Sequence, residues 1–266
     1  MLELYHNDIS VCAQKVRIVL AEKGLDWISH HINLVAGEQT APEYLAIHPK
    51  AVVPALIDDG QPVLESTLIC EYLDEKFPAP SLRPDDLVER APMRCWARIP
   101  DEGLHIACAS ISFAAIFAKQ LRAGFDDEAS FLQRMAAMPD QARAERQLKI
   151  LANRFQVPLV QDAVRLHDRL LADMEAGLEN RSWLAGEAYS LAEACLTPYL
   201  ERLDRLGLSH MWVGGRPRVA DWFDRIRERP GYDRAITAFV PATYDDRLKK
   251  LGEGVWSEVA PILSTA

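Results

Sequence analysis

Apolar and polar residues alternate at two places near the start of the chain, with a helical stripe between them. Leu2 and Leu4 alternate with polar neighbours, which predicts a short opening strand. The next apolar residues recur at helical spacing and predict a helix: Cys12, Val16, Val19 and Leu20. Gly24 ends this helix, and a second alternating stretch at 28–34 predicts another strand.

Two short apolar runs farther along predict a β-hairpin, and a helix follows them. Residues 55–57 and 63–64 flank the segment 58–60, whose Asp-Gly pair is a strong signal for a hairpin turn. A short helical piece is expected around 42–45. A longer helix, which ends before Pro78, is indicated by four apolar residues: Leu68, Ile69, Tyr72 and Leu73. The order β-α-β-α-β-β-α, with a parallel pair joined by a crossover helix, is typical of a thioredoxin-like domain.

Beyond residue 78 the strand pattern vanishes, and helical periodicity continues almost to the end of the chain. The stretch 77–84 is rich in proline and predicts a stiff connection. We expect four long helical stretches and a shorter fifth: 86–120, 128–155, 159–178, 191–206 and 219–229. The predicted fold class is α/β plus all-α. A thioredoxin-like domain would occupy 1–78, a linker 79–85 and a helical bundle domain 86–266.

The composition is that of an ordinary globular protein, and the length allows about two domains. Of the 266 residues, 49% are hydrophobic and 26% are charged, so a sizeable core can form without metals or disulfides. The formal net charge is -9 at pH 7. Because no basic block is present that could follow a phosphate backbone, we expect no nucleic acid partner.

Cysteine usage and apolar runs suggest the compartment. The cysteines are odd in number and lack CxxC spacing, which disfavours a disulfide framework or a zinc site: Cys12, Cys70, Cys95, Cys108 and Cys195. We therefore expect no metal and a reducing, cytoplasmic location. His30 and His31 would point to opposite faces of a strand, so they are not expected to share a metal.

No signal peptide is expected at the start of the sequence. The run 105–118 is about 14 residues long, short of the ~20 that cross a bilayer, so no membrane association is expected.

A polar loop leads into the first predicted helix at residues 10–17. The unpaired N–H groups and the dipole of a helix N-terminus favour anions, so a thiolate near Ser10 would be stabilised there. The alternative is that Ser10 only caps the helix. Cys12 offers a rival mechanism, because a cysteine in a first helical turn can have a lowered pKa and attack a mixed disulfide. Cys12 can equally belong to the apolar stripe.

A proline stands at the entrance to the third predicted strand. About 5–6% of X-Pro bonds in folded proteins are cis. If the bond between Val53 and Pro54 is cis, Val53 would present its N–H and C=O outward as a free strand edge. Such an edge can pair with the backbone of a peptide-like ligand. The alternative is an ordinary proline at the start of a strand.

An acid and a hydroxyl lie at the turn from the fourth predicted strand into the third helix of the first domain. Ser66 can cap this helix while the N-terminal N–H groups bind a carboxylate, and Glu65 can bind an ammonium beside it. Together these groups suit the α-amino acid end of a ligand. The alternative is a plain N-cap beside a solvated glutamate.

In this order, the nucleophile loop, the proline and the acid-serine turn resemble the glutathione transferase superfamily. Five matching stretches cover most of the chain: 10–24, 43–56, 65–78, 190–203 and 216–232. The resemblance implies the glutathione transferase fold, glutathione as cofactor, a homodimer, and serine-type catalysis by Ser10. The cysteinyl part of glutathione would pair with Val53 and Pro54. The γ-glutamyl part would bind at Glu65 and Ser66.

The chain departs from the family pattern just before Val53. Ala51 and Val52 replace the Gly-Lys or Gly-Gln that the family often has, so the usual polar side chain for the glycyl carboxylate is missing. Gln39, Lys50 or His48 would have to bind this carboxylate instead.

Two features of the predicted helical domain also follow from the resemblance. Ser190 and Glu193 form a variant of the family's capping box, which concerns folding rather than catalysis. Ser110, Phe113 and Phe117 lie on an apolar helix that, by family analogy, could border the pocket for the electrophile. The alternative is that these three residues belong to the core.

The resemblance predicts an enzyme that activates the thiolate of glutathione for attack on an apolar electrophile, in detoxification. A hydroxyl hydrogen bond and a helix N-terminus would favour the thiolate, and each unit of pKa depression corresponds to ~1.4 kcal/mol. Residues 65–73 and 81–84 look similar to bacterial β-etherases, which cleave lignin-derived aryl ethers with glutathione, so an etherase is an alternative. Two further alternatives are a non-catalytic binding module, because of Val52, and thiol–disulfide exchange through Cys12.

Overall fold

The computed structural model describes residues 1–138, 140–240 and 242–264, and contacts divide the chain into two compact units. The first unit comprises Met1–Asp101, Gly177–Leu200 and Arg218–Ala242, and the second comprises Glu102–Ala176, Glu201–Pro217 and Thr243–Ala266. The residues expected to bind glutathione all lie in the first unit. The domain boundaries expected near residues 78 and 86 remain a prediction.

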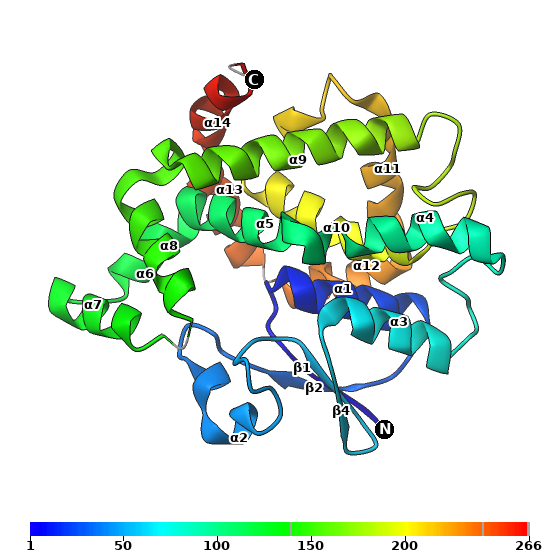
Figure 1. Ribbon diagram of the computed structural model, residues 1–266, viewed down its shortest axis with the longest axis horizontal. Helices are drawn as coiled ribbons and strands as arrows, with labels where there is room; N and C mark the ends of the chain where they lie inside the picture. Colours follow the sequence, from blue (N-terminus) through cyan, green and yellow to red (C-terminus); the bar gives the residue numbers. More distant parts are fainter. Residues whose placement is uncertain (139, 241, 265–266) are drawn as a thin grey trace. The chain divides into compact units, whose positions relative to one another are not determined.

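Four strands form one mixed sheet in the first unit, in the order β2-β1-β3-β4 (Figure 1). They are β1 (Leu2–His6), β2 (Ile28–His31), β3 (Ala55–Asp58) and β4 (Gln61–Leu64). The strands β1 and β2 are parallel and are joined through helix α1 (Val11–Glu22), whereas β3 is antiparallel to both β1 and β4. This is the thioredoxin-like arrangement that the sequence pattern predicts, although the second strand ends three residues earlier than expected.

The hairpin between β3 and β4 turns at the Asp-Gly pair. Asp59 has φ 47° and Gly60 has φ 82°, and a two-residue hairpin turn of type I′ requires positive φ at both of these positions. Glycine adopts this conformation without a steric penalty, and aspartate tolerates it better than most residues do. The predicted hairpin is therefore confirmed, with its turn where the sequence places it.

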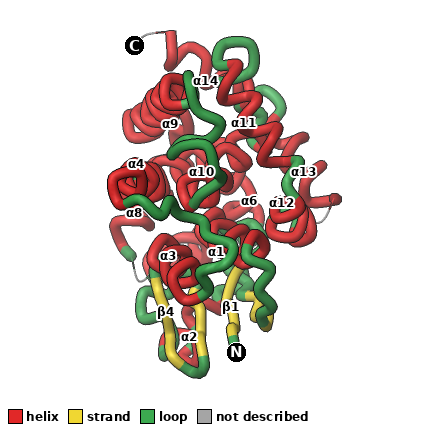
Figure 2. The backbone as a smooth tube through the Cα atoms, turned by 90° about the vertical axis from the view of Figure 1, so that its right-hand side faces the viewer, coloured by secondary structure: helices red, strands yellow, loops and turns green. Residues whose placement is uncertain are grey.

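Helices α1 and α3 (Ser66–Lys76) pack against each other beside the sheet, as Figure 2 also shows. Most apolar side chains of their stripes are fully buried, as are side chains of β1 and β3, and the set comprises Leu4, Val16, Val19, Leu20, Leu56, Ile69 and Leu73. Leu68, which was expected on the apolar face of α3, is instead 58% exposed. A short helix, α2 (Pro42–Leu45), occupies the position expected for it. This packing fixes the carboxyl end of β1 next to the start of α1, where Ser10 lies.

The single helix predicted over 86–120 is broken in the structure. It consists of α4 (Leu87–Arg98), a turn at Pro100–Leu104, α5 (His105–Ser112), a π-helical turn at Phe113–Phe117, and α6 (Ala118–Ala123). The first break has a local cause, because Pro100 supplies no backbone N–H and Gly103 has φ 122°, outside the helical region. The apolar periodicity continues across the break, which is why the pattern alone did not reveal it.

The helix predicted over 128–155 is also divided, into α7 (Glu128–Ala136) and α8 (Gln141–Asn153). Each part has its own N-cap. The Asp127 carboxylate accepts the Ser130 N–H at 2.7 Å, and the Asp140 carboxylate accepts the Arg143 N–H at 2.9 Å. Aspartate at such a position stabilises a new helix start, so this stretch forms two capped helices rather than one.

The remaining helical predictions are confirmed by α9 (Pro158–Gly177), α10 (Leu191–Arg205) and α11 (Pro217–Arg227). Three further helices were not predicted as separate elements: α12 (Pro230–Ala235), α13 (Ala242–Gly252) and α14 (Val255–Ser264). Within the described residues, no helix combines the length and the apolar character that a bilayer crossing requires.

The capping box predicted at the start of α10 is present and buried. The Ser190 N–H and hydroxyl both donate to Glu193 Oε2, at 2.9 and 2.8 Å, and Ser190 Oγ accepts the Ala192 N–H at 3.2 Å. Glu193 also accepts the Leu184 N–H at 2.7 Å through its other oxygen. The carboxylate therefore ties the preceding loop to the helix as well as capping it.

His167 on α9 is fully buried and makes stability depend on pH. Its Nδ1–H donates to the Ala163 carbonyl at 2.8 Å, whereas Nε2 is buried without a partner. Burial lowers the pKa of His167 from 6.5 to about 4. Because the folded pKa lies below the unfolded one, this contribution is fully present above pH 6.5 and is lost as pH falls towards 4.

We expect His167→Leu to weaken the dependence of folding stability on pH. The Ala163 carbonyl keeps its helical backbone partner, so the substitution removes the titration without orphaning an acceptor. Between pH 7.5 and 5, the free energy of unfolding of the wild type should fall by about 2 kcal/mol more than that of the variant. Urea denaturation at both pH values measures this difference, and equal decreases would contradict the assignment.

Candidate functional site

Ser10 lies in the loop that connects β1 to α1, at the N-cap position of the helix. Its φ and ψ are -68° and 118°, its Oγ accepts the Ala13 N–H at 3.3 Å, and its carbonyl accepts the Gln14 N–H at 2.9 Å. The capping interpretation is therefore correct, and Ser10 is also only half-buried. Since the cap uses a lone pair of Oγ, the hydroxyl hydrogen stays available for a second acceptor.

Arg17 holds the loop that precedes Ser10. Its Nη2 donates to the Asp8 carbonyl at 2.7 Å, its Nη1 donates to the Asn7 carbonyl at 3.1 Å, and its Nε donates to the Ala235 carbonyl at 2.8 Å. The side chain is 1% exposed, and burial lowers its pKa to about 10. A guanidinium with three fixed carbonyl partners is a rigid clamp, so Arg17 fixes the path of the backbone into Ser10.

His6 completes the contacts of this clamp. Its Nδ1 accepts from Arg17 Nη1 at 3.0 Å, which leaves the proton on Nε2 for the Ser29 hydroxyl at 2.7 Å. Burial and the Arg17 charge lower the pKa of His6 to about 3, so the ring is neutral at physiological pH. The Phe239 ring lies 4.3 Å from the Arg17 guanidinium carbon. His6 and Phe239 therefore support the clamp.

The neighbouring histidines on β2 contact different groups, as expected for opposite faces of a strand. His30 stacks on Tyr5 with ring centroids 4.4 Å apart, and its Nε2 lies 2.8 Å from Glu3. His31 Nε2 lies 3.5 Å from the Asp8 carboxylate.

The peptide bond between Val53 and Pro54 is cis, which is the isomer that the strand-edge hypothesis requires. Both residues are buried, and they lead directly into β3. The preceding Val52 is 38% exposed, and its carbonyl accepts the Tyr44 hydroxyl at 2.6 Å. Val53 also packs with Tyr44 and Ile32 in a small core cluster. This cluster and the Tyr44 hydrogen bond hold the segment that precedes β3 in place.

The acid-serine turn differs from the expectation in one respect, because Ser66 is not the cap of α3. Glu65 occupies the N-cap position without a side-chain cap, and its φ of 68° lies in the left-handed region that a non-glycine residue rarely adopts. Strain of this kind persists where the surrounding structure fixes it, often at ligand sites. Ser66 begins the helix, and its Oγ accepts from Lys15 Nζ at 3.1 Å.

The three candidates for the glycyl carboxylate have different environments. Lys50 is 71% exposed at its side chain and forms an ion pair with Glu65 at 2.5 Å. Gln39 donates weakly to the Leu34 carbonyl at 3.4 Å, and its Oε1 is buried without a partner. His48 is 2% exposed, and burial lowers its pKa. The structure thus brings Lys50 and Glu65 together, which sequence reasoning did not anticipate.

The residues predicted to border the electrophile belong to the second unit. Ser110 is buried and donates to the Ile106 carbonyl at 2.8 Å, and Phe113 is 6% exposed. Phe117 is half-buried beneath the Arg202 guanidinium, 5.3 Å from the ring centroid. These contacts are those of core side chains, and a role towards the electrophile stays a prediction.

Sequence reasoning missed Lys15 and Arg17, the two buried cations of α1. Their side chains are 0% and 1% exposed. A signal was available, because both residues flank Val16 in the apolar stripe and neither has an acidic residue three or four positions away with which to pair on a solvated face. A charged residue in such a position is buried only when it has partners elsewhere in the chain.

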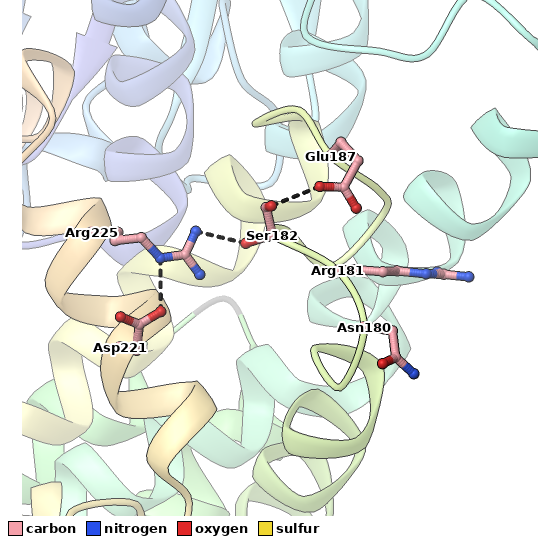
Figure 3. Close-up of a pocket in the computed structure, with 6 residues that line it drawn as sticks. All are labelled: Asn180, Arg181, Ser182, Glu187, Asp221 and Arg225. Atoms are coloured by element: carbon pink, nitrogen blue, oxygen red, sulfur yellow. Dashed lines mark hydrogen bonds and ion pairs between the residues drawn. The ribbon is translucent and has the colours of Figure 1, made fainter.

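A polar hollow of about 400 Å³ lies elsewhere in the first unit (Figure 3). Its lining residues are Asn180, Arg181, Ser182, Glu187, Asp221 and Arg225. Arg225 donates to the Asp221 carboxylate at 2.9 Å and to the Ser182 carbonyl at 2.7 Å, and Ser182 donates to Glu187 at 2.7 Å. None of the predicted site residues lines this hollow, and Arg225 and Asp221 neutralise each other within it.

Comparisons with known proteins agree with the resemblance seen in the sequence. Residues 4–81 match the family model for the glutathione S-transferase N-terminal domain, and residues 157–225 match that for the C-terminal domain. The protein LigF of Sphingobium sp. strain SYK-6 is 30% identical over 96% of this chain and 99% of its own length. The crystal structure of the β-etherase LigF superposes with a TM-score of 0.80, over 89% of this chain and 99% of that one, at 28% identity.

Two further relatives extend the comparison. Glutathione S-transferase TCHQD of Arabidopsis thaliana is 29% identical over 88% of this chain and 89% of its own length. A glutathione transferase family member from Pseudomonas fluorescens, solved with two glutathione molecules bound, superposes with a TM-score of 0.67. The superposition covers 88% of this chain and 92% of the chain in that structure. The sequence identity is 21%, so this match indicates a shared fold.

Proposed function

The chain belongs to the glutathione S-transferase family, and from that premise we propose that it conjugates glutathione to an apolar electrophile with Ser10 as the activating residue. The chain is a glutathione-dependent enzyme of this family, and glutathione is its cofactor. One observation carries the assignment of Ser10: its hydroxyl lies at the N-terminus of a 12-residue helix with its hydrogen unclaimed by the cap.

The proposed mechanism is thiol activation by two groups at one place. The N-terminus of α1 favours a negative charge, and the Ser10 hydroxyl donates its hydrogen to the glutathione sulfur. A cysteine thiol has a pKa near ~8.5, so a depression of one to two units makes the thiolate abundant at neutral pH. The thiol releases its proton to solvent, while the Ser10 hydroxyl keeps its own hydrogen and only hydrogen-bonds the sulfur. The thiolate then forms a carbon–sulfur bond with the electrophile, and the leaving group departs with the electron pair of its broken bond.

The three parts of glutathione would occupy three segments of the first unit. The cysteinyl backbone would pair with Val53 before Pro54, and Glu65 would receive the γ-glutamyl ammonium. Ser66 would bind the γ-glutamyl carboxylate.

For the glycyl carboxylate we propose Gln39 and Lys50 in preference to the buried His48. Lys50 is 71% exposed at its side chain, so its ammonium can reach a bound carboxylate, although it now pairs with Glu65, which would bind the other end of glutathione.

Two assays test the proposal. The wild type is expected to bind immobilised glutathione, to elute with free glutathione, and to release chloride from a chlorinated nitroaromatic while forming the aryl thioether. Affinity without turnover on any electrophile would instead favour a non-catalytic binding module. Activity on mixed disulfides that disappears in Cys12→Ser would favour thiol–disulfide exchange, and absence of glutathione binding would refute the proposal.

A specific observation favours a second candidate reaction, the cleavage of aryl ethers. LigF, a β-etherase by name, matches this chain along nearly its entire length. In such a reaction the glutathione thiolate would attack the carbon that bears the aryloxy group, and a phenolate would leave. A β-aryl ether with a fluorogenic phenol distinguishes the candidates, because only an etherase releases the phenol in a glutathione-dependent manner.

Three broader properties are proposed from family membership. We expect a homodimer, a cytoplasmic location and a role in detoxification. Size-exclusion chromatography with light scattering would test the first, because a dimer has about twice the 29.9 kDa mass of the chain.

A further inference from the structure

A buried lysine lies directly behind the proposed γ-glutamyl site. Lys15 is 0% exposed, and its ammonium donates to Ser66 Oγ at 3.1 Å and to Thr67 Oγ1 at 2.6 Å. The nearest carboxylate given by an ion pair belongs to Asp101, at 3.9 Å, and that side chain is 54% exposed. Among the described contacts, the Lys15 ammonium therefore donates to two neutral hydroxyls and has no anion at hydrogen-bond distance.

The charge of Lys15 persists despite its burial. Burial lowers the pKa of this ammonium, but the nearby cysteine sulfurs and the Asp101 carboxylate raise it by more, so the pKa lies above its ordinary value. Burial of a cation is costly unless an anion or several hydrogen bonds compensate it. A carboxylate bound on the far side of Ser66 would supply the compensation that the protein itself provides only in part.

The hydrogen bonds also fix how Ser66 can act. An ammonium has three donors and no acceptor, so the Ser66 oxygen must accept from Lys15 and its own hydrogen must be donated elsewhere. Polarisation by a cation makes the hydroxyl a better donor, because hydrogen bonds in a chain strengthen one another. The lysine therefore presets Ser66 as a donor towards an anionic ligand.

We propose that Lys15 is a positioning residue that gives the enzyme its selectivity for the α-carboxylate of the γ-glutamyl group, acting through the hydroxyl of Ser66. This inference rests on the proposed binding of glutathione in the first unit. It assigns the recognition of one ligand group to a side chain outside the acid-serine motif, 51 residues away from Ser66 in the sequence.

Two ligands separate this role from a merely structural one. Glutathione and 4-aminobutanoyl-cysteinyl-glycine differ only in the α-carboxylate. The wild type should bind glutathione about tenfold or more tightly than this analogue. In Lys15→Met, which matches the stem but lacks the charge, affinity for glutathione should fall by about tenfold, while affinity for the analogue changes less than about twofold. Isothermal titration calorimetry with each ligand measures both constants.

Two further variants complete the test. In a Lys15→Met background, Ser66→Ala should cost little additional affinity for glutathione, because the two residues act as one unit. Asp101→Asn, which removes a half-exposed partial counter-charge, should increase discrimination between the ligands by about two- to threefold. This variant keeps the proposal testable if Lys15→Met does not fold.

The outcomes separate the inference from the function on which it rests. If the wild type binds neither ligand, both the proposed function and the role of Lys15 fail. If the wild type discriminates and Lys15→Met weakens both ligands equally, the lysine has a structural role only and the inference alone is overturned. An unchanged ratio of the two affinities in Asp101→Asn would likewise contradict the role of Lys15 and leave the proposed function standing.

Discussion

Ser10→Ala is expected to lower kcat/KM at pH 6.5 by about 10- to 100-fold while leaving the affinity for glutathione within about threefold. The reason is the proposed donation of the Ser10 hydrogen to the bound sulfur. Without this hydrogen bond, the pKa of the bound thiol should rise by one to two units. At pH values well below the pKa, each unit lowers the thiolate fraction about tenfold. The loss should shrink as the pH rises towards 9, where both enzymes hold the thiolate.

The capping role of Ser10 requires a matched control. Its Oγ accepts the Ala13 N–H, so alanine removes a helix cap as well as a donor and costs about 1 kcal/mol of stability. Ser10→Gly removes the same hydrogen but costs only a few tenths of a kcal/mol as a cap. If activity depends on the donated hydrogen, both variants should lose it equally although their stabilities differ.

The pH–rate profile decides between Ser10 and the rival nucleophile. The apparent pKa in kcat/KM for the electrophile, measured with glutathione saturating, should move upward in both Ser10 variants and stay unchanged in Cys12→Ser. Full turnover by Ser10→Ala at pH 6.5 would contradict the assignment. Loss of activity in Cys12→Ser with Ser10 variants unaffected would move the chemistry to the first-turn cysteine.

Elements with short-range causes could be predicted from the sequence. The hairpin follows from two adjacent residues, Asp59 and Gly60, whose backbone preferences coincide with the turn. The cap of α10 follows from Ser190 and Glu193, three positions apart. In each case the groups that interact are near neighbours in the chain, so the pattern contains the whole interaction.

Helix breaks inside continuous apolar patterns could not be predicted in the same way. The chain turns at Pro100–Leu104, although both flanking segments keep helical periodicity. Periodicity reports which side chains are buried, whereas continuity depends on whether each backbone N–H finds its partner four residues earlier. Proline and a left-handed glycine interrupt those partners without interrupting the apolar stripe.

The turns that hold Ser10 and Glu65 could be located from the sequence, whereas the buried cations behind them could not. Ser10 and Glu65 belong to local motifs, but the cations behind them find partners far away in sequence. Lys15 contacts Ser66 and Thr67, and Arg17 contacts the carbonyl of Ala235. No local pattern encodes such pairs, because they exist only after the sheet and helices have packed.

Arg17→Met is expected to destabilise the fold by about 3–5 kcal/mol, the largest stability change that we predict. The substitution removes the Arg17 donor from the buried Ala235 carbonyl and the part-buried Asp8 carbonyl, whereas the Asn7 carbonyl still accepts the Ser10 N–H at 3.2 Å. Each buried group left without a partner costs about 1–3 kcal/mol. His6 loses the donor to its Nδ1 as well. Removing the cost of burying the guanidinium offsets part of this loss.

Arg234 provides the matched control, because its Nη2 also donates to a backbone carbonyl, that of Ala21, at 2.7 Å, but at an exposed position. Arg234→Met should cost less than about 1 kcal/mol, since water replaces the lost donor. Urea denaturation compares the two variants directly, and similar losses would contradict the clamp.

Arg17→Lys keeps the charge without the planar fork and should recover less than half of the stability that Arg17→Met loses. If the clamp also fixes Ser10, the Arg17→Lys enzyme should show a raised apparent pKa in kcat/KM together with its lower stability, whereas a residue that only stabilised the core would leave that pKa unchanged.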